Sequence, residues 1–366
     1  MKLIPPIIKG PISIVHFITK KCNARCSHCF IDFDNPATFK GELTVGEIEK
    51  FTKSVGWQLQ NVNITGGEPF LRRDIFSIAK CYLDNAHIKT MYITTNGFFT
   101  AFVKEFIELY LAAGYDRLLI FSLSIDDFPE KHDINRKVKG LFEKTIETYK
   151  TIQGFNHPKI LANVNLTVIP ANYKKMLDIY EYLVTEIGIK SFTTTIVREE
   201  GVMKIPVNLK ADILSVYKQL NSRIDEDIRS KRIQGFQGGV IGRMMNAKNT
   251  VMHSVIEQTF MENTFVTPCY AGDLFLVLEA NGDIKPCEVL ENKELGNIRD
   301  YDYNLQKLWS AKKAEETRKW ITSTKCRCTY ECAASFNVLF NTKHIPALAK
   351  NLINIHSKPL FFGRSK

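Results

Sequence analysis

Lys21-Cys22-Asn23-Ala24-Arg25-Cys26-Ser27-His28-Cys29-Phe30 is the stretch around which the sequence is organised. It places three cysteines in the spacing C-x3-C-x2-C. Three thiolates in one short loop can bind three irons of a cubic iron–sulfur cluster, which leaves the fourth iron without a protein ligand. An open iron can bind a small molecule. The spacing therefore predicts a metal site that does chemistry, in contrast to a closed structural site.

Two other interpretations of this loop stay open. A zinc site takes four Cys or His ligands, but His28 directly precedes Cys29, where reaching the same metal is awkward. Disulfides fit poorly, because the nine cysteines are odd in number and the N-terminus is too short and too proline-broken for a secretory signal. We expect a cytoplasmic chain, in which cysteines are more often metal ligands than disulfides.

The composition limits the classes of partner. The formal net charge is +10 over 366 residues, but the charge is spread along the chain, which indicates a solvated basic surface. No run of 18 or more apolar residues occurs, so no membrane span is expected. The sequence lacks an RNP motif or a C2H2 finger, and we expect no nucleic-acid partner.

Strand-like and helix-like segments alternate from residue 11 to about residue 197. Mostly apolar strands are predicted at 12–18, 62–65, 90–95, 118–125, 160–169 and 191–197. Helices are expected after Thr44, which forms a capping box with Glu47, after the N-cap Asp74, and at 101–113, 140–153 and 172–187. This order predicts an α/β fold, a partial (β/α)6 TIM-like barrel with a parallel sheet.

Polar and cysteine residues follow the predicted strands. Such folds place their chemistry at the C-terminal ends of the strands. At these ends lie the cysteine loop, the Gly66-Gly67-Glu68-Pro69 turn, Asn96, Asp126 and Arg198. We therefore expect them to form one site.

The second half of the chain no longer shows the regular alternation of strands and helices. We assign residues 1–200 to the core, 201–268 to a helical bridge without a chemical motif, 269–335 to a small cysteine-rich α+β unit, and 336–366 to a basic C-terminal tail. In the bridge, 212–233 and 251–260 are predicted to be helical and 234–242 a loop. Asn281-Gly282 predicts a type I′ hairpin, and a helix is expected at 304–320.

The cysteine-rich unit holds five cysteines, namely Cys269, Cys287, Cys326, Cys328 and Cys332. A second metal site is favoured over spare buried thiols, and a structural zinc would also fit this unit taken alone. Cys81 lies in a predicted helix among apolar residues and is expected to be simply buried.

Together these motifs resemble the radical S-adenosylmethionine (radical SAM) enzymes that carry a C-terminal SPASM or twitch-type auxiliary-cluster domain. Cys22-x3-Cys26-x2-Cys29 matches the cluster motif of that family, with His28 in the usual aromatic position. Gly66 to Pro69 matches the turn that grips the methionine amino group. Cys269-x12-Gly282-x4-Cys287 matches the first half of the SPASM pattern. The resemblance covers about residues 12–332.

The resemblance implies that SAM binds the open iron of a [4Fe–4S] cluster through its amino and carboxylate groups. Glu68 and backbone carbonyls near Gly66 would hold the ammonium, and Ser124 and Asp126 would bind the ribose. Asn96 and Arg198 are further candidates for this pocket. Three alternatives stay open: the Gly66–Pro69 turn as a plain surface turn, Asp126 as a cap of its loop, and Arg198 in a salt bridge with Glu199 or Glu200.

The cysteine-rich unit departs from the seven-cysteine SPASM set. Five thiolates can complete one four-cysteine cluster. We expect a single auxiliary [4Fe–4S] cluster held by Cys269, Cys287, Cys332 and one of Cys326 or Cys328.

As for activity, the resemblance implies a radical SAM oxidoreductase. The reduced cluster would cleave SAM to a 5′-deoxyadenosyl radical that abstracts hydrogen from the substrate, with a flavodoxin- or ferredoxin-type electron donor. Peptide-modifying relatives often carry an extra N-terminal domain, and the first cluster cysteine is already residue 22, which favours a small molecule such as a sugar or lipid. The alternatives are a peptide maturase and a protein-activating, sulfatase-maturase-like enzyme. A non-catalytic metal- and nucleic-acid-binding protein is a distant alternative.

The tail is apolar and basic together from Ile345 to Arg364. Such a composition suits contact with a membrane surface or an anionic lipid-linked substrate. Docking of the tail on the barrel is the favoured interpretation.

Overall fold

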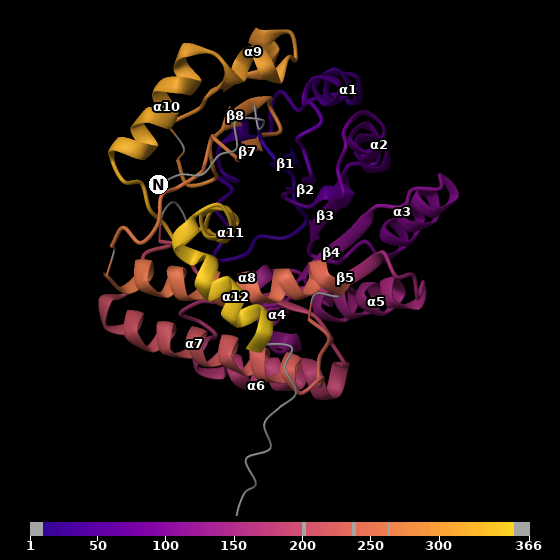
Figure 1. The fold of residues 1–366 in the computed structure, drawn as a ribbon. Coiled ribbons are helices and arrows are strands. Elements are labelled where there is room, and N and C mark those ends of the chain that lie inside the picture. The colour runs from indigo at the N-terminus through magenta and orange to yellow at the C-terminus, as the bar shows by residue number, and fades with distance from the viewer. Residues whose placement is uncertain (1–9, 200–202, 236–238, 263, 291, 355–366) are drawn as a thin grey trace, which may run out of the picture.

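The computed structural model describes residues 10–199, 203–235, 239–262, 264–290 and 292–354. Its strands are β1 (Ser13–Thr19), β2 (Asn61–Gly66), β3 (Thr90–Thr95), β4 (Leu118–Ser124), β5 (Ile160–Val168), β6 (Phe192–Ile196), β7 (Phe275–Leu278), β8 (Asp283–Lys285) and β9 (Gly296–Asn297). Within the described residues they form one sheet in the order β6-β5-β4-β3-β2-β1-β7-β8-β9. In Figure 1 the labelled strands β1 to β5, β7 and β8 follow a curve.

The parallel core confirms the predicted α/β fold. Strands β1 to β6 pair in parallel in sequence order, and each of their ends lies within one residue of its predicted position. The cysteine-rich segment, predicted as a small α+β unit, does not have a sheet of its own. Its first strand, β7, pairs in parallel with β1, with Val15 beside Val277. The sheet of the core therefore continues directly into the cysteine-rich unit.

The helices flank this sheet. They are α1 (Val45–Ser54), α2 (Ile75–Asn85), α3 (Thr100–Ala112), α4 (Pro129–Arg136), α5 (Leu141–Gly154), α6 (Met176–Tyr182), α7 (Val207–Arg229), α8 (Gly239–Glu262), α9 (Leu305–Trp309), α10 (Lys312–Ser323), α11 (Glu331–Leu339) and α12 (Ile345–Asn354). In Figure 1, α1, α2, α3 and α5 lie outside the curve of the strands. Helix α8 packs against α7, α11 and α12. The predicted bridge therefore joins the core to the end of the chain.

The helix-facing side of the sheet is apolar. Alternate strand residues on this side are buried in the main hydrophobic core, among them Ile14, Ile64, Ile93, Phe121 and Val164. Burying such side chains stabilises the fold by about 1.5–3 kcal/mol each. Apolar burial on this side therefore stabilises the domain, and the residues on the opposite side can be polar.

The concave side of the sheet is polar from β2 to β6. Its residues hydrogen-bond across strands, as between Thr94 Oγ1 and Asn63 Oδ1 (3.2 Å) and between Asn163 Nδ2 and Thr193 Oγ1 (3.0 Å). Most of its residues are half-buried, whereas their neighbours in the chain are buried. The concave side is therefore a partly exposed hydrogen-bonding surface.

Several helix predictions needed correction. Helix α4 was not predicted. The segment 172–187 is a short 3-10 turn (Tyr173–Lys175), α6 and a π-helical turn (Leu183–Ile187). The predicted helix at 304–320 is two helices, α9 and α10. Helix α8 begins at Gly239, within the predicted loop, and α7 begins at Val207 and ends at Arg229.

The two predicted N-caps had different outcomes. Thr44 and Glu47 form the expected capping box. Asp74 occupies the N-cap position of α2 but makes no capping hydrogen bond. Its carboxylate accepts two hydrogen bonds from the Arg72 guanidinium instead, at 2.9 and 2.6 Å. The ion pair takes the carboxylate because a bidentate charged contact is stronger than a neutral cap.

The hairpin at Asn281-Gly282 is present, but its turn is not type I′. A type I′ turn needs positive φ at both central residues, and only Gly282 has one (+91°). The amide of Glu279 donates to the carbonyl of Asp283 (2.9 Å), and the amide of Gly282 donates to the carbonyl of Glu279 (3.0 Å). The loop is therefore longer than two residues and uses a single left-handed glycine.

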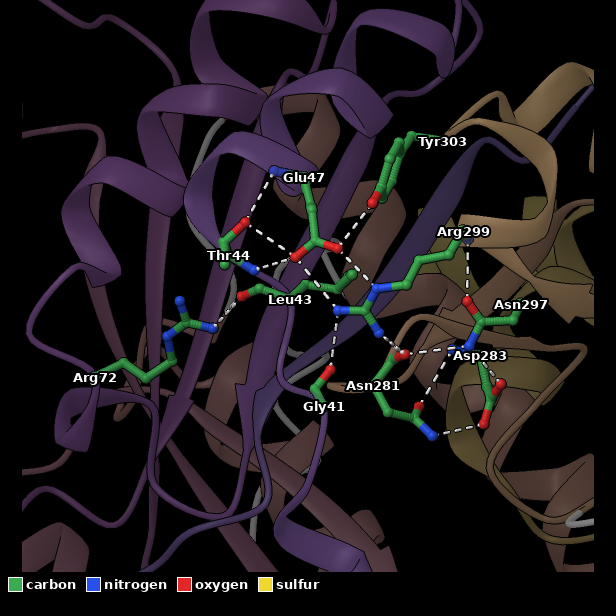
Figure 2. Close-up of polar contacts among 10 residues, drawn as sticks. All are labelled: Gly41, Leu43, Thr44, Glu47, Arg72, Asn281, Asp283, Asn297, Arg299 and Tyr303. Carbon is green, nitrogen blue, oxygen red and sulfur yellow. Dashed lines mark hydrogen bonds and ion pairs between the residues drawn. The ribbon is translucent and has the colours of Figure 1, made fainter.

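A polar cluster fastens the cysteine-rich unit to α1 (Figure 2). The Arg299 guanidinium donates to both carboxylate oxygens of Glu47, at 2.7 and 3.3 Å. It also donates to the carbonyls of Asn281 (2.7 Å) and Gly41 (3.1 Å). The Tyr303 hydroxyl donates to Glu47 as well (2.9 Å). The capping box thus serves a second purpose, because the same carboxylate anchors a segment 252 residues away.

The predicted tail is helical in its described part. Helix α12 packs against α8, which agrees with docking on the rest of the chain. Residues 355–366, with the remaining basic and aromatic residues of the tail, lie outside the described residues. Across the described ranges, none of the helices is long and apolar enough to cross a membrane.

Candidate SAM and iron–sulfur site

The cysteine loop follows β1, and its thiols are free and half-buried. The amide of Ala24 donates to Cys22 Sγ (3.3 Å), and the amide of Cys29 donates to the carbonyl of Cys26 (3.2 Å). Burial raises the pKa of all three thiols, that of Cys22 to about 11. Such thiols stay protonated near neutral pH until a metal displaces the proton. The loop therefore suits a metal centre better than a reactive free thiol.

The last turn of helix α4 is hydrogen-bonded to the backbone of the cysteine loop. The amide of Arg25 donates to the carbonyl of Arg136 (3.0 Å), and the amide of Ser27 donates to the carbonyl of Asn135 (3.2 Å). The Ser27 hydroxyl also donates to the Asn135 side chain. The last turn of α4 therefore fixes the backbone between the first and third cysteines.

The glycine turn after β2 lies directly against the chain that enters the cysteine loop. A Cβ at Gly66 would lie 2.1 Å from the carbonyl oxygen of Thr19, and one at Gly67 would lie 2.1 Å from that of Lys21. The amides of Gly67 and Glu68 donate to these same carbonyls, both at 2.8 Å. Only glycine allows this approach. The turn is therefore tied by its backbone to the chain that enters the cysteine loop, and its contact with SAM stays a prediction.

Glu68 is fully buried at the centre of this arrangement. Its carboxylate accepts hydrogen bonds from the Thr95 hydroxyl (2.8 Å) and from the amides of Asn96 (2.8 Å) and Phe70 (3.1 Å). Burial raises the pKa of the Glu68 carboxyl to about 7, although these donors act to lower it. Glu68 thus joins the end of β2 to the end of β3. Contact of Glu68 with the SAM ammonium stays a prediction.

Asn96 connects the end of β3 to the cysteine loop. Its Nδ2 donates to Asn23 Oδ1 (2.8 Å) and lies 4.0 Å from Cys22 Sγ. Its Oδ1 accepts the amide of Phe98 (3.0 Å). The structure therefore brings Asn96 into the predicted site, beside the first cysteine.

Asp126, after β4, is buried and ion-paired. Arg136 donates to its Oδ2 from Nε (3.0 Å) and Nη2 (2.6 Å), and His28 Nε2 lies 3.7 Å from the same oxygen. Burial alone would raise the pKa of the Asp126 carboxyl, but Arg136 lowers it on balance. Its Oδ1 has no hydrogen-bond partner, so an acceptor remains for a ligand. Ser124 is half-buried at the end of β4. Ribose binding by either residue stays a prediction.

Arg198, after β6, lies at the junction of the two cysteine-rich parts. Its Nη2 donates to Glu288 Oε2 (2.9 Å), and its guanidinium lies over the rings of Tyr330 (5.0 Å) and Phe30 (5.8 Å). The expected alternative partner Glu199 pairs with Lys210 instead. Arg198 therefore links the cysteine loop to the cysteine-rich unit, and its role toward SAM stays a prediction.

The C-terminal cysteines share one environment. Cys269 and Cys287 are buried in one apolar cluster with Tyr330, and the partly buried cysteines Cys326, Cys328 and Cys332 pack against it. Burial, together with the nearby thiols of Cys269 and Cys326, raises the pKa of Cys287 to about 12. Such a cluster of thiols suits a metal centre. Cys81, a residue of α2, is buried in the main hydrophobic core and apart from both groups, as predicted.

Among the described residues, no three His, Cys, Asp or Glu side chains converge on one metal ion. A cubic cluster does not need such convergence, because each cysteine binds a different iron. The thiols, the close glycine turn and the unpartnered Asp126 Oδ1 fit a cluster with a ligand on its open iron.

Some residues of the site were not predicted. Arg136 and Asn135 belong to α4, whose sequence has no apolar periodicity. Glu288 directly follows Cys287, and its Oε1 accepts the Tyr330 hydroxyl (2.7 Å). Lys248, in the bridge, is buried and donates to Ser335 Oγ (3.0 Å). Of these residues, only Glu288 could have been identified from the sequence, because it directly follows the predicted metal ligand Cys287.

Two family models match the chain. One, described as the radical SAM superfamily, covers residues 17–183. The other, SPASM, is described as an iron–sulfur cluster-binding domain and covers residues 269–333. The first match contains the cysteine loop and the glycine turn, and the second contains all five C-terminal cysteines.

A curated relative, described as an AdoMet-dependent heme synthase from Methanosarcina barkeri (strain Fusaro / DSM 804), is 33% identical over 181 residues. The matched part is 49% of this chain and 48% of the relative. The chain therefore matches about half the length of this relative.

Two solved structures share the fold. One is anSMEcpe with bound AdoMet and Kp18Cys peptide, at a TM-score of 0.58 and 16% identity, with coverage of 94% of this chain and 96% of that one. The other is Streptococcus suis SuiB bound to the precursor peptide SuiA, at a TM-score of 0.56 and 17% identity, with coverage of 84% and 66%.

Proposed function

The chain belongs to the radical SAM superfamily and carries a C-terminal SPASM domain, and we propose that it oxidises or rearranges a small polar molecule by radical chemistry. Cys22, Cys26 and Cys29 would hold the SAM-binding [4Fe–4S] cluster. A cluster and SAM bound there would supply reductive cleavage of the sulfonium C–S bond to methionine and a 5′-deoxyadenosyl radical, which would abstract hydrogen from the substrate.

The residues of the chain orient these groups. Gly66 and Gly67 let the backbone approach the cysteine loop, so their neighbouring carbonyls can reach the methionine ammonium. Glu68 locks this turn against Asn96 through a hydrogen bond of 2.8 Å. Asp126 Oδ1 keeps an acceptor for a hydroxyl group. Prior placement of these groups lowers the entropy cost of reaction.

The proposal of a small polar substrate rests on the polar concave side of the sheet. It runs from Ser124 and Asn165 near the cysteine loop toward Asn163. A cavity of about 290 Å³ opens at the opposite end of the strands, lined in part by Asn163, Lys190 and His157. A wall of amides and hydroxyls matches a substrate with several hydrogen-bonding groups, such as a sugar, better than an acyl chain.

The C-terminal cysteines would hold a second cluster. We propose Cys269, Cys287, Cys332 and one of Cys326 or Cys328 as its ligands. Their shared burial supports the assignment. Arg198 and Glu288, in contact at 2.9 Å, would fix the distance between this group and the cysteine loop.

A peptide substrate is the second candidate. It is favoured by the likeness in fold to SuiB bound to a precursor peptide and to anSMEcpe bound to a peptide. Equilibrium binding of a tripeptide library and of a sugar library to the SAM-loaded enzyme would separate the two classes. Binding of peptides alone would exclude the small-molecule proposal.

The activity itself is tested by anaerobic reconstitution with iron and sulfide, followed by SAM and dithionite. We expect 5′-deoxyadenosine and methionine in equal amounts. Cys26→Ala should abolish both products, whereas Cys81→Ala should leave them unchanged. A fully loaded wild-type protein that releases no 5′-deoxyadenosine would refute the proposal.

A further inference from the structure

Helix α12 uses one of its faces to pack against the other described elements. Ala347 and Leu348 are partly buried against the main hydrophobic core, and the helix lies along α8, in front of it in Figure 1. The opposite face carries Ile345, Ala349 and Ile353, which are spaced four residues apart and therefore form one stripe of the helix. Ile345 is 54% exposed and Ile353 is 70% exposed. An apolar stripe of α12 thus points away from the protein.

Another exposed apolar side chain lies near the start of α12. Phe265 is 39% exposed, and the carbonyl of its neighbour Val266 accepts a hydrogen bond from Lys343 Nζ at 3.4 Å. Lys343 lies two residues before Ile345, the first residue of α12. The ammonium of Lys325 lies 6.0 Å from the centre of the Phe265 ring. Two lysines therefore border this ring at the end of α12 where the apolar stripe begins.

The segment that contains α12 is basic. No Asp or Glu occurs from Cys332 to the end of the sequence, whereas the same segment holds five lysines and arginines, namely Lys343, Lys350, Lys358, Arg364 and Lys366. Within the described ranges, Lys343 and Lys350 form no ion pair. Glu262, exposed at the end of α8, is the acidic residue that opposes this charge from the side of Phe265. The charge that remains available around the stripe is positive.

The combination of aliphatic, aromatic and basic side chains limits what can cover the stripe. A second copy of the chain would place the same bases opposite one another, and like charges repel. A nucleic acid would match the bases, but it offers phosphates and flat base faces, which aromatic side chains bind better than isoleucines do. A membrane with anionic lipids matches both features, since it offers phosphates above an apolar layer.

We propose that the exposed stripe of α12, with Phe265 and the lysines beside it, binds the surface of a membrane that contains anionic lipids. Ile345, Ile353 and Phe265 would enter the boundary between headgroups and acyl chains, and Lys343 and Lys350 would lie among the lipid phosphates. Stable attachment of this kind needs apolar and electrostatic contributions together. The inference goes beyond the proposed function and does not depend on it, because none of these residues belongs to the candidate site.

The test is co-sedimentation of the full-length reconstituted protein with sucrose-loaded vesicles. Vesicles of phosphatidylcholine and phosphatidylglycerol in equal parts are compared with vesicles of phosphatidylcholine alone. The variants are Ile345→Gln/Ile353→Gln and Lys343→Gln/Lys350→Gln. Trp57→Gln is the matched control, because Trp57 is exposed to the same extent as Ile345 (54%) and follows α1, which lies apart from α12 in Figure 1. Circular dichroism and light scattering report the fold and the oligomeric state of each protein.

We expect the wild type to sediment with the mixed vesicles and not with phosphatidylcholine alone, and added salt should release it because salt screens exposed charges. The double lysine variant should bind about 25-fold more weakly, from about fivefold for each base. The double isoleucine variant should bind at least about tenfold more weakly, whereas Trp57→Gln should bind like the wild type.

A wild-type protein that does not sediment with the mixed vesicles, or that binds both vesicle types equally, would overturn the inference. Equal binding by the wild type and Ile345→Gln/Ile353→Gln would do the same. A wild-type dimer that this variant separates into monomers would show that the stripe joins two copies instead. The variant should form 5′-deoxyadenosine like the wild type when no vesicles are present, so the result on vesicles is separate from the test of the proposed function.

Discussion

The contact between Glu47 and Arg299 gives a quantitative prediction for how the cysteine-rich unit is held to the core. The Glu47 carboxylate accepts five hydrogen bonds, from Arg299 twice, from Thr44 twice and from Tyr303 (Figure 2). Glu47→Gln keeps the size of the side chain but removes its charge. The Arg299 guanidinium then faces a neutral amide.

The magnitude follows from the pKa of Glu47. Hydrogen bonds from Arg299, followed by those from Thr44 and Tyr303, lower it from 4.5 to about 2. One pKa unit equals about 1.4 kcal/mol, which sets an upper limit of about 3 kcal/mol. The Arg299 side chain is 34% exposed, and solvent screening reduces such contributions. We therefore expect Glu47→Gln to destabilise the protein by about 1–2 kcal/mol.

The pH dependence has a defined sign. Because the folded-state pKa of Glu47 is lowered, its contribution is fully present above the unfolded value of 4.5 and is lost as the pH falls through about 2. The difference between wild type and Glu47→Gln should therefore be constant between about pH 6 and pH 8, a range well above both pKa values.

The assay is the rate of anaerobic unfolding in urea, followed by far-UV circular dichroism, for a double-mutant cycle of Glu47→Gln and Arg299→Met. A loss of 1–2 kcal/mol changes the folded/unfolded ratio by about 5- to 30-fold, and unfolding is faster by this factor when the contact is already broken in the transition state. The coupling between the two changes should be about 1 kcal/mol or more. Glu49→Gln on the same helix removes an exposed pair with Lys53 and should change the rate by less than about twofold. Independent effects of Glu47 and Arg299, without coupling, would refute the reasoning.

Three other predictions concern the site. Gly67→Ala should prevent loading of the first cluster, since its Cβ would lie 2.1 Å from the Lys21 carbonyl; iron analysis should show one cluster fewer, and full loading would contradict the close approach. Cys287→Ala should lower the iron content by about one cluster, whereas Cys81→Ala should not change it; equal iron in both variants would exclude the auxiliary assignment. Arg198→Met should lower thermal stability by about 1–3 kcal/mol, because it removes the charged partner of Glu288 Oε2 and leaves the mostly buried carboxylate with only the Tyr330 hydroxyl at Oε1; an unchanged melting temperature would argue against this contact.

The parts of the site that were predicted depend on residue types with few alternative uses. Three cysteines within eight residues and two adjacent glycines before Glu68 admit few structural interpretations. Their placement followed from strand order, because parallel strands present their C-terminal ends at one edge of the sheet. The capping box of Thr44 and Glu47 could also be predicted, because it involves only residues that are three positions apart in the sequence.

The parts that were missed depend on contacts between segments far apart in the sequence. Helix α4 buries His132 and Arg136, so it has no apolar stripe to reveal it. Arg198 pairs with Glu288, 90 residues further on, and not with its neighbour Glu199, which pairs with Lys210; Glu200 lies outside the described residues. Asn281-Gly282 has the composition of a two-residue turn, but Asn281 keeps a negative φ. In each case contacts with distant segments decided the structure, and the local sequence pattern did not.

The most direct test of the account is electron–nuclear double resonance on the reduced enzyme with SAM carrying ¹⁵N in its amino group and ¹⁷O in its carboxylate. Because Cys22, Cys26 and Cys29 would leave one iron without a protein ligand, the account predicts strong hyperfine coupling of both labels to the cluster. Cys26→Ala should abolish the signal. A fully loaded wild-type protein that binds SAM but shows no coupling to either label would contradict the central claim that SAM binds the open iron.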